Sequence, residues 1–142
     1  MKILLAVDGS KNSLDAVNAL IKHADWFRET PKVTLVHVRL PVPRIGAFGA
    51  GPSKTALANY YNEEGAKCLA KANRLLDKAN VPHVNEILVG EPAAKICKLA
   101  ATGKADLICM GSRGLGAAAN LLFGSVATKV LHGAKVPVLL VK

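Results

Sequence analysis

Residues 105–125 read ADLICMGSRGLGAAANLLFGS, and this stretch decides the fold class of the chain. It opens with an apolar run, 105–110, of the kind that forms a strand buried on both faces. A glycine-rich segment follows, and after it apolar residues return on one face of a helical pattern, at Val126, Ala127, Val130 and Leu131. A buried strand, a glycine-rich loop and a helix in this order predict an α/β protein.

The glycine-rich loop is a candidate phosphate site. Gly111, Gly114 and the pair Gly124–Ser125 lie between the strand and the helix, where backbone N–H groups converge on an anion. Glycine lets a ligand approach the backbone closely. Ser125 is expected to cap the new helix and to offer its hydroxyl to a phosphate oxygen. A flexible loop that binds nothing is the alternative interpretation.

Apolar runs and helical patterns alternate along the whole chain. Buried strands are predicted at residues 2–7, 33–40, 83–89, 106–110 and 136–141. Helices are predicted between them from the spacing of Leu14, Val17, Ile21 and Ala24, of Leu69, Ala72, Leu76 and Ala79, of Pro92, Ile96 and Ala100, and of Phe123, Ala127, Val130, Leu131 and Ala134. Because crossovers between parallel strands are right-handed, the alternation predicts a parallel sheet with helices on both faces.

One connection, residues 41–54 (PVPRIGAFGAGPSK), is longer than most loops of its kind. Gly46 and Gly51 are spaced as in a phosphate-binding P-loop, but Pro52 stands where that motif requires lysine. Pro52 also lacks the N–H that such a loop would use. We therefore interpret the segment as a lid or binding flap whose role is open.

Length and composition predict one globular domain, residues 1–142. The chain has 142 residues, of which 51% are hydrophobic and 20% charged. No apolar run approaches the roughly 18 residues that span a bilayer, and Asp8 interrupts the apolar start too early for a signal peptide. Three cysteines without a Cys-x-x-Cys pair agree with a cytoplasmic protein, and Cys97 and Cys109 are expected in the core.

The charge balance predicts attraction to anions without a nucleic-acid surface. Lysine and arginine outnumber aspartate and glutamate by 19 to 10, a net charge of +9. No two basic residues are adjacent, however, and aromatic residues make up only 4% of the chain. A stacking platform for single strands has little to build with. The four histidines lack metal-ligand spacing, so no metal site is predicted.

In an open parallel sheet, ligands bind outside the carboxyl ends of the strands, where the strand order reverses. The first strand ends in Asp8–Gly9–Ser10 and the fourth in Met110–Gly111. If these strands are neighbours, Asp8 faces the glycine-rich loop and can accept hydrogen bonds from ribose hydroxyls or an adenine amino group. Asp8 could instead belong to the turn that starts the first helix.

The chain resembles the universal stress protein family from end to end. The resemblance rests on KILLAVDGS (2–10), VTLVHV (33–38), GEPAAKI (90–96), ADLICMGSRG (105–114) and VPVLLV (136–141), in that order. ATP-binding members of the family carry a Gly-x2-Gly-x9-Gly-Ser/Thr motif. Gly111, Gly114, Gly124 and Ser125 satisfy this motif, so the chain is similar to the ATP-binding branch.

The resemblance implies a five-stranded sheet of order 3-2-1-4-5 and a role for each site residue. Asp8 would hold the nucleoside, with Ala6 and Val7 lining that wall, and Val38 would meet adenine through its backbone. Met110 is a further expected binding residue. Gly111 and Gly114 would wrap the ribose and the first phosphate. Gly124, Ser125 and Val126 would hold the outer phosphates, and Arg113 would add a phosphate contact.

The leading functional prediction is an adenine-nucleotide-binding module of the stress response. ATP is the expected ligand, ADP and AMP would also fit the loop, and Mg²⁺ would arrive bound to the phosphates. A slow ATPase or autophosphorylating protein is one alternative, and an interaction protein that needs no nucleotide is another. The resemblance also implies a homodimer through the last strand, 136–141, whose apolar edge a second subunit would cover.

Overall fold

The computed structural model of the chain describes residues 1–42, 53–115 and 122–142. Most of the predicted flap, residues 41–54, therefore lies outside the described residues. Gly46 and Gly51, which have the P-loop-like spacing, are among the residues that are not described. The elements follow in the order β1 (Lys2–Ala6), α1 (Lys11–Lys22), a short 3₁₀ helix η1 (Ala24–Trp26), β2 (Lys32–Arg39), α2 (Lys54–Lys78), β3 (His83–Val89), α3 (Pro92–Thr102), β4 (Leu107–Gly111), α4 (Ser125–Gly133) and β5 (Val138–Val141).

The five strands form one parallel sheet in the order β3-β2-β1-β4-β5, which confirms the predicted fold. In the middle of the sheet, Leu5 of β1 pairs with Leu35 of β2 on one side and with Cys109 of β4 on the other. All three side chains are fully buried. Strands this deeply buried are uniformly apolar, which is why they appear in the sequence as continuous runs.

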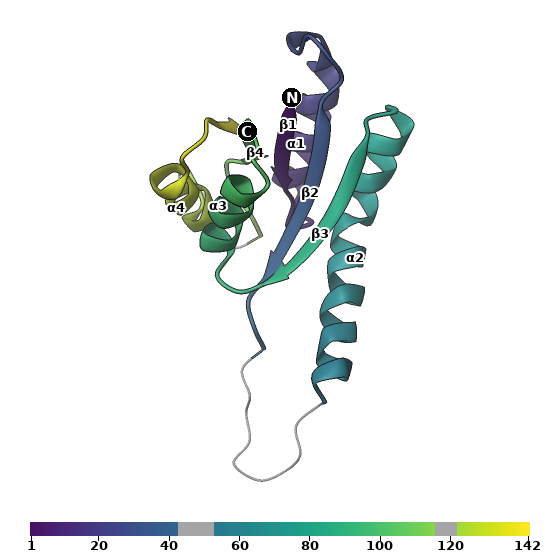
Figure 1. Cartoon of the computed structure of the whole chain (residues 1–142), viewed down its shortest axis with the longest axis vertical. Coiled ribbons are helices and arrows are strands. Elements are labelled where there is room, and N and C mark those ends of the chain that lie inside the picture. The colour runs from purple at the N-terminus through teal and green to yellow at the C-terminus, as the bar shows by residue number, and fades with distance from the viewer. Residues whose placement is uncertain (43–52, 116–121) are drawn as a thin grey trace.

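Helices cover both faces of the sheet (Figure 1). Alternate strand residues point to opposite faces, so two cores form. One core joins Leu5 and its neighbours to Val17 of α1 and Leu69 of α2. The other joins Leu4 and its neighbours to Ile96 of α3 and Val130 of α4. Figure 1 shows α2 running past the carboxyl ends of β2 and β3.

Three helices begin at side-chain caps. The Ser10 hydroxyl accepts the Ser13 N–H at 3.2 Å and the Ser53 hydroxyl accepts the Ala56 N–H at 3.1 Å. The Glu91 carboxylate accepts the Ala94 N–H at 2.7 Å, directly before Pro92 at the first position of α3. Each satisfies a donor that the first helical turn leaves without a partner.

The start of α4 differs from the prediction. Ser125 was expected to cap this helix, but it is the first helical residue, and Gly124 occupies the cap without a side-chain hydrogen bond. Phe123 therefore precedes the helix and is 40% exposed. Leu131 is 42% exposed, so it does not belong to the buried face, which carries Ala127 and Val130.

Strand ends shift by one or two residues. The last strand begins at Val138 instead of residue 136, because Pro137 has no N–H and takes part only through its carbonyl, which accepts the Ile108 N–H at 3.0 Å. Cys109 is fully buried as predicted, whereas Cys97 is only partly buried. Within residues 1–42, 53–115 and 122–142, no helix is both long enough and apolar enough to cross a bilayer.

Candidate functional site

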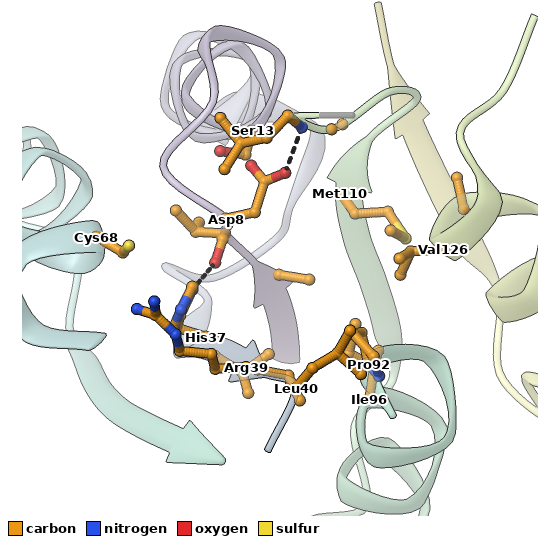
Figure 2. A pocket seen from close by; sticks show the side chains of 18 of the residues that line it. Asp8, Ser13, His37, Arg39, Leu40, Cys68, Pro92, Ile96, Met110 and Val126 are labelled. Carbon is orange, nitrogen blue, oxygen red and sulfur yellow. Dashed lines mark hydrogen bonds between the residues drawn. The ribbon is translucent and has the colours of Figure 1, made fainter. Parts of the chain in front are cut away.

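A cavity of about 750 Å³ opens at the carboxyl ends of β1, β2 and β4 (Figure 2). The chain proceeds from β1 to β2 and β3 on one side and then returns to β4 on the other, so the strand order reverses between β1 and β4. This is the place where open α/β sheets bind ligands. The volume lies within the range of small-molecule sites, which is about 300–1,000 Å³.

Asp8 lies two residues after the end of β1 and is hydrogen-bonded to the glycine-rich loop. Its Oδ1 accepts the Ser10 N–H at 2.9 Å, and its Oδ2 accepts the Leu115 N–H at 3.1 Å. Asp8 therefore fulfils both interpretations of its sequence context, the turn before α1 and the contact across the crevice. Burial alone would raise the pKa of Asp8, but hydrogen bonds from Ser10 and Leu115 outweigh it and hold the pKa below its ordinary value.

Two glycines of the loop are explained by close packing. A Cβ on Gly111 would lie 2.7 Å from the Asn12 carbonyl oxygen at the start of α1. A Cβ on Gly114 would lie 2.5 Å from Asp8 Oδ2. Neither position leaves room for a side chain. The same two glycines that suggest phosphate binding thus also allow the loop to approach α1 and the Asp8 carboxylate.

Gly124 departs from the predicted site. It does not line the cavity, and its φ of −73° is open to any residue. A Cβ there would meet the Arg113 Cα at 3.4 Å, an ordinary contact. Gly124 acts instead through its backbone, because its N–H donates to the Ser112 carbonyl at 2.8 Å and its carbonyl accepts the Thr128 hydroxyl at 3.1 Å.

The remaining predicted residues are brought together. The cavity is lined by Ala6, Val7, Asp8, Val38, Met110, Gly111, Arg113, Gly114, Ser125 and Val126. They come from the ends of β1, β2 and β4, from the described part of the glycine-rich loop, and from the first turn of α4. The structure thus assembles these residues around one space, and what that space binds is taken up below.

The end of the cavity at α4 suits an anion. Ser125 and Val126 present the first turn of this helix, whose free N–H groups carry partial positive charge. Arg113 lines the same space, and its Nε is buried without a hydrogen-bond partner among the residues that the structure describes. A buried donor without a partner is costly, so a ligand that accepts its hydrogen bond would be favoured.

The cavity has two chemically different sides, divided by the plane of the sheet. Side chains on the face of α3 and α4 are apolar, namely Val36, Val38, Leu40, Pro92, Ile96, Met110 and Val126. The face of α1 and α2 presents polar groups, namely Ser13, His37, Arg39 and Cys68. Figure 2 shows Cys68 and Arg39 across the cavity from Met110 and Val126.

Sequence reasoning missed His37, Arg39, Cys68, Pro92 and Ile96 as lining residues. His37 and Arg39 flank Val38 in a strand, so their side chains leave the sheet on the face opposite to Val38. The alternation of side chains along this strand could therefore have predicted His37 and Arg39 as lining residues. Cys68 gave no such signal, because its place follows from how α2 packs against β2, β3 and α1. Among the described residues, no cluster of histidine, cysteine, aspartate and glutamate side chains could hold a metal ion.

Comparison with known proteins places the chain in one family. The family model described as the universal stress protein family matches residues 1–142. A universal stress protein of Methanocaldococcus jannaschii is 36% identical over 141 residues, which cover 99% of this chain and 81% of the relative.

Solved structures agree with this fold. A universal stress protein in complex with cAMP superposes with a TM-score of 0.72 at 26% identity, over 100% of this chain and 97% of that chain. The universal stress protein of Archaeoglobus fulgidus in complex with dAMP superposes with a TM-score of 0.69 at 23% identity, over 100% and 98%. Structural relatives of the chain therefore bind adenine nucleotides.

Proposed function

This chain belongs to the universal stress protein family, and from that premise we propose that it is a binding module for adenine nucleotides with ATP as its ligand. The observation that carries the proposal is the cavity at the reversal of strand order, where Asp8 is hydrogen-bonded to an N–H of the glycine-rich loop. Relatives that hold cAMP and dAMP support the nucleoside part of this ligand. Support for the triphosphate part comes from the glycine-rich loop and the start of α4.

The nucleoside is proposed to lie at the ends of β1 and β2. Adenine is flat and largely apolar, so it fits the side of the cavity that Ala6, Val38 and Met110 line. The lowered pKa of Asp8 keeps its carboxylate ionised at neutral pH, where it accepts hydrogen bonds from the nucleoside. Each oxygen of Asp8 keeps a lone pair free beyond its bond to the backbone.

The phosphates are proposed to extend toward the first turn of α4. Ser125 and Val126 offer backbone N–H groups there, Ser125 adds a hydroxyl, and Arg113 adds a positive charge. The net charge of +9 favours an anionic ligand over the whole surface. ADP and AMP would use the same contacts in part, and Mg²⁺ would enter as a complex with the phosphates.

Binding without efficient hydrolysis fits the lining best. Phosphoryl transfer to water needs a group that orients the nucleophile and cations that neutralise the developing charge. Asp8 is the only carboxylate among the described lining residues. It lies at the nucleoside end of the proposed ligand. We therefore expect bound ATP to stay intact over many minutes, a time in which a typical ATPase completes many turnovers.

Two measurements test this proposal. Mass spectrometry of the ligand released from the purified, denatured protein would identify any nucleotide that co-purifies. Titration calorimetry with ATP, ADP, AMP and adenosine should then show affinity rising with each phosphate, and GTP should bind more weakly than ATP. Absence of binding for all adenine nucleotides would contradict the proposal.

A matched pair of variants ties binding to the cavity. Asp8→Ala should weaken ATP and adenosine by similar factors, because the carboxylate contacts the part that they share. Loss of a hydrogen bond to a charged group costs about 1.5–3 kcal/mol, or roughly 10- to 150-fold in affinity. Asp25→Ala removes the same charge from the exposed helix η1 and should leave both affinities unchanged. An effect of Asp8→Ala on ATP alone would place Asp8 at the phosphates instead.

A further inference from the structure

We propose that His37 is a specificity-determining residue that selects the nucleoside end of the ligand through a hydrogen bond accepted by its Nε2 atom. This inference rests on the proposed function, because it concerns the same cavity. It gives a hydrogen-bonding role to the His37 side chain, which the nucleotide contacts proposed above do not include.

His37 lies in β2 and is only 6% exposed. Its Nδ1 is 2.9 Å from the Val7 carbonyl oxygen, directly after the end of β1 (Figure 2). A carbonyl oxygen only accepts hydrogen bonds, so the hydrogen of this bond sits on Nδ1. In the neutral ring the lone pair is then on Nε2, and the contact with Val7 fixes that tautomer.

Nε2 has no hydrogen-bond partner among the residues that the structure describes, and His37 lines the cavity. Nε2 is not one of the fully buried atoms that lack a partner in the described part of the chain, so it is open to the cavity, where a ligand or water can donate a hydrogen bond to it. The nearest polar side chain of β2 is committed elsewhere. Arg39 donates to the Glu64 carboxylate at 3.3 Å and to the Tyr60 hydroxyl at 3.2 Å, both on α2.

The chemistry of Nε2 decides which part of a nucleotide can approach it. A lone pair needs an N–H or O–H donor, and ionised phosphate oxygens offer none. In the neutral ring, Nε2 therefore offers ionised phosphate no hydrogen bond, whereas Arg113 and the first turn of α4 carry N–H donors. The donors that an adenine nucleotide carries are the exocyclic amine of the base and the hydroxyls of the ribose. His37 thus orients the ligand as well as selecting it.

A coupling experiment tests this assignment. Calorimetry would measure the affinity of AMP and of three analogues that each lack one donor: purine riboside 5′-monophosphate, 2′-deoxy-AMP and 3′-deoxy-AMP. The wild-type protein should bind the analogue that lacks the donor to His37 several-fold to about tenfold more weakly than it binds AMP. Which analogue loses affinity tells whether the base or the ribose supplies that donor.

Two variants separate this role from a structural one. His37→Asn places an amide nitrogen where Nδ1 stood, so it keeps the bond to Val7 but removes the acceptor at the far side of the ring. In this variant the sensitive analogue and AMP should bind equally well. His37→Gln carries an amide oxygen near the position of Nε2 and should restore the preference for AMP. A residue that acts only by supporting Val7 would change all four affinities by the same factor.

Several results would overturn the assignment. If no analogue binds more weakly than AMP to the wild-type protein, Nε2 accepts nothing from the ligand, whatever the variants do. If the loss for each analogue is the same in the wild type and in both variants, His37 is not coupled to the ligand. If AMP and ATP do not bind to the wild type at all, the proposed function fails first, and the two failures are thus distinguishable.

Discussion

Gly114 packs closely against the Asp8 carboxylate in the site. Replacing Gly114 with alanine would put a methyl group 2.5 Å from Asp8 Oδ2, so the carboxylate or the loop must shift and the bond from Leu115 is disrupted. We expect Gly114→Ala to weaken ATP binding at least tenfold, because a hydrogen bond to a charged group is lost. Calorimetry measures this directly.

Gly124→Ala is the matched control for Gly114→Ala. Both glycines belong to the motif, yet the added methyl at Gly124 would make only an ordinary contact of 3.4 Å, and the backbone there has a φ of −73°. We expect ATP affinity to stay within about threefold of the wild type, since no contact is lost. Equal losses in the two variants would mean that the motif acts through both glycines alike and that the packing against Asp8 is not decisive.

Asp8 also links stability to pH. Its pKa is lowered in the folded protein, so the ionised carboxylate stabilises the fold above the ordinary pKa of 3.8, and this contribution is lost as pH falls through the lowered value. Asp8→Asn lacks this charge at every pH. The difference in unfolding free energy between the wild type and this variant should be constant from neutral pH down to about 5 and should shrink below 3.8. Urea unfolding at pH 7 and at pH 3 tests the sign.

At the scale of elements, the end of α3 carries a local mismatch. Lys104 has a left-handed φ of 51°, whereas the preceding Gly103 has an ordinary φ of −77°. The glycine thus stands one residue before the left-handed position, which glycine occupies most easily and which Lys104 occupies here. Lys104→Gly should stabilise the protein by about 1 kcal/mol, because the left-handed conformation is costly for a side chain. Lys104→Ala removes the charge but keeps the strain and should gain nothing. Thermal unfolding of both variants distinguishes strain from charge.

The elements also show what could be predicted from the sequence. The central strands β1 and β4 were predictable because they are buried on both faces and hence uniformly apolar, as Leu4 and Ile108 illustrate. The start of α4 was not, because Phe123 and Leu131 match the helical spacing although both are substantially exposed. Hydrophobic spacing cannot tell a residue that packs on the sheet from one that lies at the rim of a site.

The site was predictable where it depends on strand order and on backbone. Asp8 faces the loop because β1 and β4 are neighbours, an order that the family resemblance implied and the alternation alone left open. His37 was missed although the alternation along its strand pointed to it, whereas Cys68 was missed because a single cysteine on a helix carries no pattern along the chain. Ser125 was misjudged as a cap, because a serine before a helix and a serine within its first turn look the same in sequence.

At the scale of the whole molecule, β5 is the edge strand beside β4, and its apolar residues are only half-buried. An apolar edge with free backbone groups favours pairing with another strand. We predict a homodimer in which β5 of two subunits pair across a two-fold axis. Sedimentation velocity at micromolar concentration should give the mass of two chains of 14.9 kDa. A species with the mass of one chain would contradict the dimer and leave the nucleotide site unaffected.

The central claim is that an adenine nucleotide occupies the cavity at the ends of β1, β2 and β4. The most direct test is a titration of ¹⁵N-labelled protein with ATP, followed by amide chemical shifts. The account predicts large shifts at Asp8, Gly111, Gly114, Ser125 and Val126, with no change at the amides of exposed residues outside the cavity lining, such as Trp26 and Val84. Amide shifts that are absent, or that cluster on another face of the molecule, would contradict it.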